Sequence, residues 1–217
     1  MGSDQAAIVM ADHHHHNKPM NIDIKRSSFV RPSSPTPTST IWTSNLDLVV
    51  GRIHILTVYF YRPNGGSNFF DSDVMKKSLA DVLVSFYPMA GRISRDRNNG
   101  RVEINCNGEG VLFVEAESDS TLDDFGEFTP SPELRRLTPT VDYSGDISSF
   151  PLFFAQVTHF KCGGVALGCG VFHTLSDGLS SIHFINTWSD MARGLSIAIP
   201  PFIEPTCYHA RRFFPCI

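Results

Sequence analysis

The chain has 217 residues, enough for one large domain or two small ones with a buried core. Acidic residues outnumber basic ones by 22 to 18, and the net charge of −4 favours neither nucleic acid nor an anionic membrane surface as a partner. No stretch of about 18 uninterrupted apolar residues occurs, so we expect no membrane span. The five cysteines lack Cys-x-x-Cys spacing, which is typical of free thiols in a reducing compartment. These features predict a soluble cytoplasmic protein.

The N-terminal residues 1–21 are polar and lack the apolar run of a signal peptide, so we expect a disordered leader. Four consecutive histidines at 13–16 raise the question of a metal site. A contiguous run of histidines has no fixed geometry and no supporting hydrogen bonds to orient its rings. We therefore predict a polar leader and no metal site.

Several segments have the period-two alternation, or the β-branched and aromatic residues, of strands. We predict strands at 21–25, 52–61, 101–105, 110–117, 152–161 and 165–172. Apolar residues recur at helical spacing between Asp71 and Tyr87, with Asp71 or Ser72 as the N-cap and Pro88 ending the helix. Residues 31–40 (RPSSPTPTST) and the acidic link 118–150 predict surface loops, the latter with one weak helical turn.

The final third of the chain predicts a strand, a turn and a helix in succession. Glycines in the strand 165–172 leave room for close backbone approach, and His173 starts the turn. The helix is indicated by apolar residues at helical spacing, namely Leu179, Ile182, Ile185, Trp188 and Met191 or Ala192. Gly194 occupies the position of a C-terminal cap. The mixed order of elements predicts an α/β fold of α+β layers, with a mixed sheet and flanking helices.

The motif His173-x-x-x-Asp177-Gly178 is the candidate for chemistry. In a chain with nine histidines, a His–Asp pair at this spacing arises easily by chance. On spacing alone, a strand-end histidine and a helix-capping aspartate are the favoured interpretations.

Eight blocks in one order change this weighting. They are SNLD (44–47), TVYFYRP (57–63), SNFFD (67–71), FYPMAGR (86–92), GEGVLFV (108–114), FKCGG (160–164), HTLSDG (173–178) and HFINTWSDMARG (183–194). Through them the chain resembles the N-terminal part of the BAHD family of plant CoA-dependent acyltransferases, and within it the hydroxycinnamoyltransferases acting on quinate or shikimate. The resemblance implies a chloramphenicol-acetyltransferase-like N-terminal domain over 22–195 and a truncated inter-domain crossover or tail over 196–217.

The resemblance also assigns roles to residues. His173 would be the general base, a neutral imidazole that takes the proton of an acceptor hydroxyl as its oxygen attacks a thioester. Asp177 would hold the loop, usually through a buried arginine, and Gly178 would give the tight turn into the helix. Thr57 and Tyr59 would line the substrate pocket. Acyl-CoA would be a co-substrate, with no permanently bound cofactor and no metal.

The acceptor predicted by the resemblance is quinate, because VVGRIHILT (49–57) and the form of the histidine motif lean toward quinate enzymes. Shikimate is the alternative acceptor; Ile55 stands where shikimate-type relatives often carry threonine. The small-molecule partners would be these acids and a hydroxycinnamoyl-CoA.

Two other classes stay open. A thiol-dependent enzyme would use Cys162 or Cys169, although glycine-flanked cysteines in an apolar strand are more typical of a core. A catalytically inactive remnant or interaction module is the second, because the family's second domain and its Asp-Phe-Gly-Trp-Gly motif do not occur in this chain. The family's full-length form would be a monomer, whereas exposed apolar surface on a lone domain predicts self-association.

Overall fold

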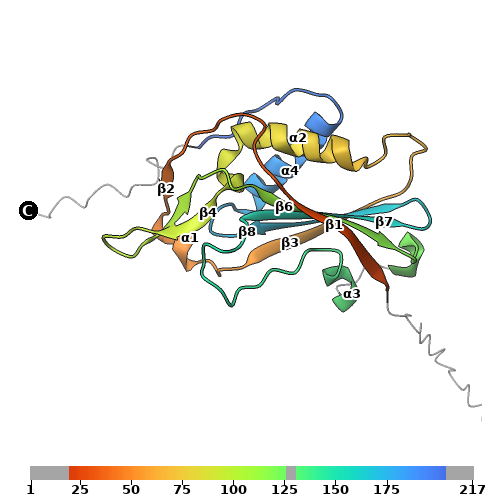
Figure 1. The fold of residues 1–217 in the computed structure, drawn as a ribbon, viewed down its shortest axis with the longest axis horizontal. Coiled ribbons are helices and arrows are strands. Elements are labelled where there is room, and N and C mark those ends of the chain that lie inside the picture. Colours follow the sequence, from red (N-terminus) through yellow and green to blue (C-terminus); the bar gives the residue numbers. More distant parts are fainter. Residues whose placement is uncertain (1–19, 126–130, 204–217) are drawn as a thin grey trace, which may run out of the picture.

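A mixed five-stranded sheet forms the centre of the molecule (Figure 1), in a computed structural model that describes residues 20–125 and 131–203. The strands, in spatial order, are β1 (Ile22–Val30), β6 (Val111–Ser118), β7 (Phe153–Phe160), β8 (Val165–Phe172) and β3 (His54–Tyr61). Only β6 and β7 are parallel within this sheet, and the other neighbours are antiparallel. The predicted mixed sheet and α/β class are confirmed. The histidine run at 13–16, most of the predicted leader and the tail beyond residue 203 lie outside the described residues.

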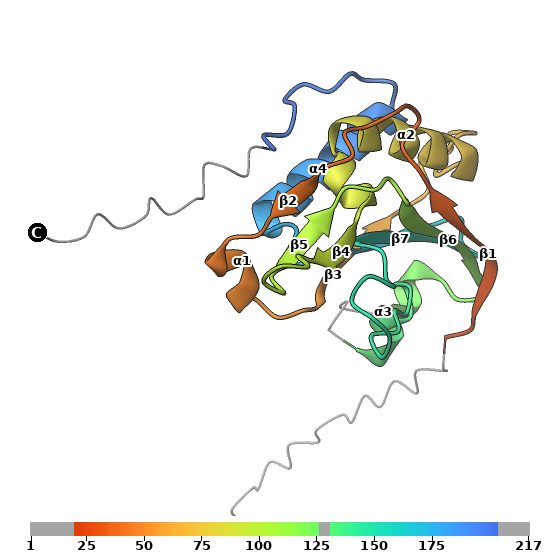
Figure 2. The same cartoon turned by 60° about the vertical axis from the view of Figure 1, so that its left-hand side comes forward.

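A smaller antiparallel sheet, seen in front in Figure 2, lies beside the end of the main one. It consists of β2 (Thr40–Trp42), β5 (Val102–Asn105) and β4 (Arg92–Arg95). The sequence predicted β5 but neither of its partners, and a short helix that follows β2, α1 (Asn45–Val49), was also not predicted.

Two long helices, α2 (Ser72–Ser85) and α4 (Gly178–Ala192), cover one face of the main sheet (Figures 1 and 2). Asp71 caps α2 as predicted, and a 3-10 turn, η1 (Tyr87–Ala90), follows the helix at Pro88. The helices are joined by Trp188, whose indole N–H donates to the carbonyl oxygen of Met75 at 3.0 Å. None of the helices within the described ranges is long and apolar enough to cross a membrane.

The end of α4 is a Schellman motif, as the glycine there predicts. Gly194 has a φ of 81°, and its N–H donates to the carbonyl oxygen of Met191. The N–H of Leu195 donates to the carbonyl oxygen of Asp190. The cap fixes where the chain leaves the helix.

The link between β6 and β7 covers the other face of the sheet, with the 3-10 turn η2 (Leu122–Phe125) and the short helix α3 (Pro132–Arg135). The close approach predicted at the glycines of β8 is confirmed, since a Cβ on Gly168 would lie 2.0 Å from the carbonyl oxygen of Leu137. His54 fastens the end of the link: its Nε2 donates to the carbonyl oxygen of Pro151 at 2.8 Å, and its Nδ1 accepts from the Tyr143 hydroxyl at 2.6 Å. The sheet is therefore buried on both faces near the start of the histidine motif.

Candidate functional site

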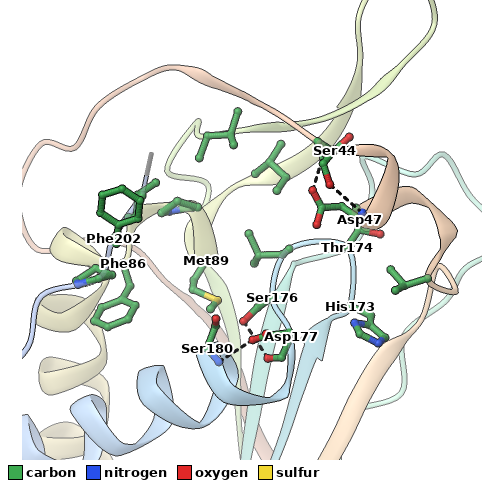
Figure 3. A pocket seen from close by; sticks show the side chains of 18 of the residues that line it. Ser44, Asp47, Phe86, Met89, His173, Thr174, Ser176, Asp177, Ser180 and Phe202 are labelled. Carbon is green, nitrogen blue, oxygen red and sulfur yellow. Dashed lines mark hydrogen bonds between the residues drawn. The ribbon is translucent and has the colours of Figure 1, made fainter. Parts of the chain in front are cut away.

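A cavity of about 520 Å³ lies where β8 gives way to α4 (Figure 3). One side is formed by the loop 173–177 with Ser180 and His183, and the opposite side by the segment 41–47. Phe86, Pro88, Met89 and residues 201–203 complete the lining. Segments far apart in the sequence thus meet around His173.

His173 is held at its backbone and free at its ring. Its N–H donates to the carbonyl oxygen of Ile53 at 3.0 Å, which fastens the start of the loop to the segment before β3. The half-buried side chain lines the cavity, and its Nδ1 is buried without a hydrogen-bond partner among the described residues. An unsatisfied buried polar atom costs about 1–3 kcal/mol. Such a cost is more typical of a reactive site than of a histidine that serves only packing.

Asp177 is the N-cap of α4 and makes no hydrogen bond to His173. Its carboxylate accepts from the backbone N–H of Ser180 at 2.8 Å, and Figure 3 shows it turned toward that residue. Hydrogen bonding from Ser180 lowers the pKa of Asp177, and the nearby His173 contributes in the same direction. The carboxylate therefore orients the loop from the helix end.

The buried arginine implied by the resemblance is not found beside Asp177 within the described residues. Arg92 is buried, but its Nη1 donates to the carbonyl oxygens of Gly91 and Gly110, each at 2.7 Å. Gly178 is the first residue of α4, and an added Cβ there would meet open space. No described contact requires glycine at that position.

Thr57 and Tyr59 do not line the cavity that contains His173. They lie on the edge strand β3, opposite Cys169 and Leu167 of β8, and both are half-buried. Their side chains share the sheet face on which Tyr59 packs against the core under the helices. The structure therefore brings His173 and Asp177 to one cavity and leaves the two β3 residues outside it.

Sequence reasoning missed the wall opposite His173, formed by residues 42–47, and the aromatic contact of His183 with Phe86, whose ring centroids are 5.3 Å apart. The signal was present, because these residues fall within three of the blocks that carry the family resemblance. What the blocks lacked was any indication that they meet in space.

The thiols do not form a second site. Cys169 lies within the core, and burial raises the pKa of its thiol. Cys162 is exposed in the turn between β7 and β8 rather than inside a strand, so its expected place was wrong. Across the described ranges, no cluster of three or more histidine, cysteine or acidic side chains has the geometry of a metal site.

Fold and site together define an α/β domain of the acyltransferase type, with a histidine at a strand–helix junction. The chain belongs to the Transferase family, the BAHD acyltransferases, whose pattern it matches over residues 20–212.

It is 58% identical over 192 residues to the shikimate O-hydroxycinnamoyltransferase of Nicotiana tabacum, covering 88% of this chain and 44% of that protein. It is 49% identical to the rosmarinate synthase of Plectranthus scutellarioides, with the same coverage of both chains. The crystal structure of vinorine synthase is similar with a TM-score of 0.70 and 30% identity, over 84% of this chain and 45% of that one. The chain thus spans a little under half the length of these relatives.

Proposed function

We propose that this chain is the part of a hydroxycinnamoyltransferase that carries the general base, with a hydroxycinnamoyl-CoA as donor. The observation that carries the proposal is the His173 ring, which lines a cavity and has a buried nitrogen without a partner. The names of the relatives, among them a shikimate O-hydroxycinnamoyltransferase and a rosmarinate synthase, support the hydroxycinnamoyl donor.

In the proposed reaction the neutral imidazole of His173 accepts the proton of the acceptor hydroxyl while the oxygen attacks the thioester carbonyl. The tetrahedral intermediate then collapses, the carbon–sulfur bond breaks, and the CoA thiolate takes the proton back from the imidazolium. No covalent enzyme intermediate is needed, because a thioester is already activated and the enzyme holds both reactants in place. Asp177 keeps the loop in register by capping α4.

We propose quinate as the acceptor, on the form of residues 49–57, and shikimate as the alternative, on the name of the tobacco relative. Both acids offer a ring hydroxyl to His173, so the base serves either one. The free thiols of the described cysteines agree with the reducing environment of the cytoplasm, where we place the protein.

We further propose that these 217 residues alone turn over slowly. The relatives are about twice as long, and the groups that orient CoA and stabilise the oxyanion would come from the remaining length. Leu179 and Ile182 at the start of α4 are 79% and 49% exposed beside the cavity, although they belong to the predicted apolar stripe of this helix. Such uncovered apolar surface promotes self-association of the isolated chain.

The test is ester formation from caffeoyl-CoA with quinate or shikimate in separate reactions, measured by liquid chromatography with mass detection. Two proteins are compared: the chain alone, and a hybrid completed by the part of the tobacco relative beyond the aligned 192 residues. We expect ester from the hybrid, with quinate preferred, and little from the chain alone. A hybrid that folds but forms neither ester contradicts the proposed function, and a preference for shikimate overturns the acceptor.

A further inference from the structure

We infer that Arg101 is a positioning residue that holds the wall of the cavity opposite His173. This wall, residues 42–47, is called the Trp42 wall below. The inference rests on the proposed function for its catalytic meaning. The position of the wall itself is a separate claim.

Arg101 directly precedes β5 and contacts three successive parts of the wall. Its Nε and Nη2 both donate to the carbonyl oxygen of Thr43, at 3.0 and 2.6 Å. Nη2 also donates to Oδ1 of Asn45 at 2.9 Å, at the first residue of α1. The guanidinium carbon lies 4.4 Å from the centroid of the Trp42 ring, in cation–π geometry. One planar side chain thus fixes a ring, a carbonyl group and the start of a helix.

The wall has few other fixed points. The helix α1 has five residues, none of them buried, and Leu46 and Val49 are 75% and 79% exposed. A helix this short is unstable without tertiary contacts, since isolated helices need about 12–15 residues. The remaining polar contacts are local: the Thr43 hydroxyl donates to the carbonyl oxygen of Val102 at 2.5 Å, and Ser44 forms a capping box with Asp47. Arg101 is therefore the long-range polar contact of the wall beyond Thr43.

The chemistry requires arginine rather than any cation. Two donors on one carbonyl, a third on an amide oxygen and a flat face on an indole match the guanidinium fork, which a lysine ammonium lacks. The wall faces His173 across a cavity of about 520 Å³, so its displacement changes where a substrate lies relative to the base. Misplacement by roughly 1 Å can cost about 100-fold in rate. Loss of the fork should therefore weaken substrate positioning while the base stays intact.

The first readout uses the chain as it is. Its two tryptophans differ in exposure, because Trp188 is 1% exposed and Trp42 lines the cavity. Acrylamide quenching of fluorescence therefore reports mainly on Trp42. We expect Arg101→Gln and Arg101→Lys to increase the quenched fraction. Arg97→Gln, an exposed arginine in the turn of the same hairpin, is the matched control and should leave it unchanged.

The second readout is kinetic, in the hybrid that contains the tobacco C-terminal part. We expect both Arg101 variants to lower kcat/KM about tenfold or more, mainly through a higher KM, and Arg97→Gln to match the unmodified hybrid. Quenching equal to that of the Arg97 control overturns the inference. So does a loss of stability that exposes Trp188 equally, because that indicates a general structural role. An inactive unmodified hybrid contradicts the proposed function alone, and the quenching comparison still decides whether Arg101 holds the wall.

Discussion

The buried imidazole of His54 should make stability depend on pH in a defined window. Desolvation by burial lowers the pKa of His54 from 6.5 to about 4, with the hydrogen bond to the carbonyl oxygen of Pro151 acting weakly in the opposite direction. Below pH 6.5 the unfolded chain takes up a proton at this residue while the folded protein does not. The unfolded state is thereby favoured, so stability falls as the pH drops from 6.5 toward 4.

The magnitude follows from the size of the shift. Each pKa unit is worth about 1.36 kcal/mol, so the whole window of about 2.5 units corresponds to roughly 3 kcal/mol. Between pH 6.5 and 5 the expected loss is about 2 kcal/mol by the same conversion. Carboxylates whose pKa is lowered in the fold, such as Asp177 and Glu115, lose their contribution in more acidic solution. The range from pH 7 to 5 therefore favours the histidine.

The assay is urea unfolding at pH 7, 6 and 5 for the unmodified chain and for His54→Gln, whose amide donates to Pro151 without titrating. We expect the free energy of unfolding to fall between pH 7 and 5 by about 2 kcal/mol more in the unmodified chain than in the variant. Parallel pH dependence in the two proteins would refute the reasoning, because it would mean that His54 takes up its proton as readily in the fold as in the unfolded chain.

Two further predictions concern the ends of the histidine motif and of β8. Asp177→Ala should lower the free energy of unfolding by about 1 kcal/mol through loss of the helix cap, whereas Asp177→Asn keeps an oxygen acceptor and should cost much less. Equal losses in chemical denaturation would contradict the capping role. Gly168→Ala should cost roughly 1–3 kcal/mol, because its Cβ would lie 2.0 Å from the Leu137 carbonyl oxygen. Gly178→Ala has open space and serves as the control; an equally large loss there would sink the steric argument.

The elements that the sequence predicted well carry strong local signals. The helix starting after Asp71 and the one ending at Gly194 have clear periodicity and recognisable caps, and both appear in the structure. β2, β4 and α1 were missed because they are three, four and five residues long and depend on tertiary partners. Such short segments have too few residues for a period to be read.

The site was predictable only at its centre. His173 and Asp177 are neighbours along the chain, so the motif placed them in one loop without knowledge of the fold. The partner of Asp177 could not be read in the same way. The backbone N–H of Ser180 fills that place, where the resemblance implied an arginine. The wall held by Arg101 is assembled from segments almost 60 residues apart, and no local pattern predicts such a contact.

The direct test of the central claim is the rate of ester formation by the completed hybrid after His173→Ala. The matched control is His159→Ala, a half-buried histidine on β7 that does not line the cavity. We predict that His173→Ala lowers turnover by about 10²–10⁴, the usual contribution of a general base, with an unchanged melting temperature. We predict near-normal turnover for the control. A hybrid that retains turnover close to the His159→Ala level after loss of the His173 ring would contradict its role as the base.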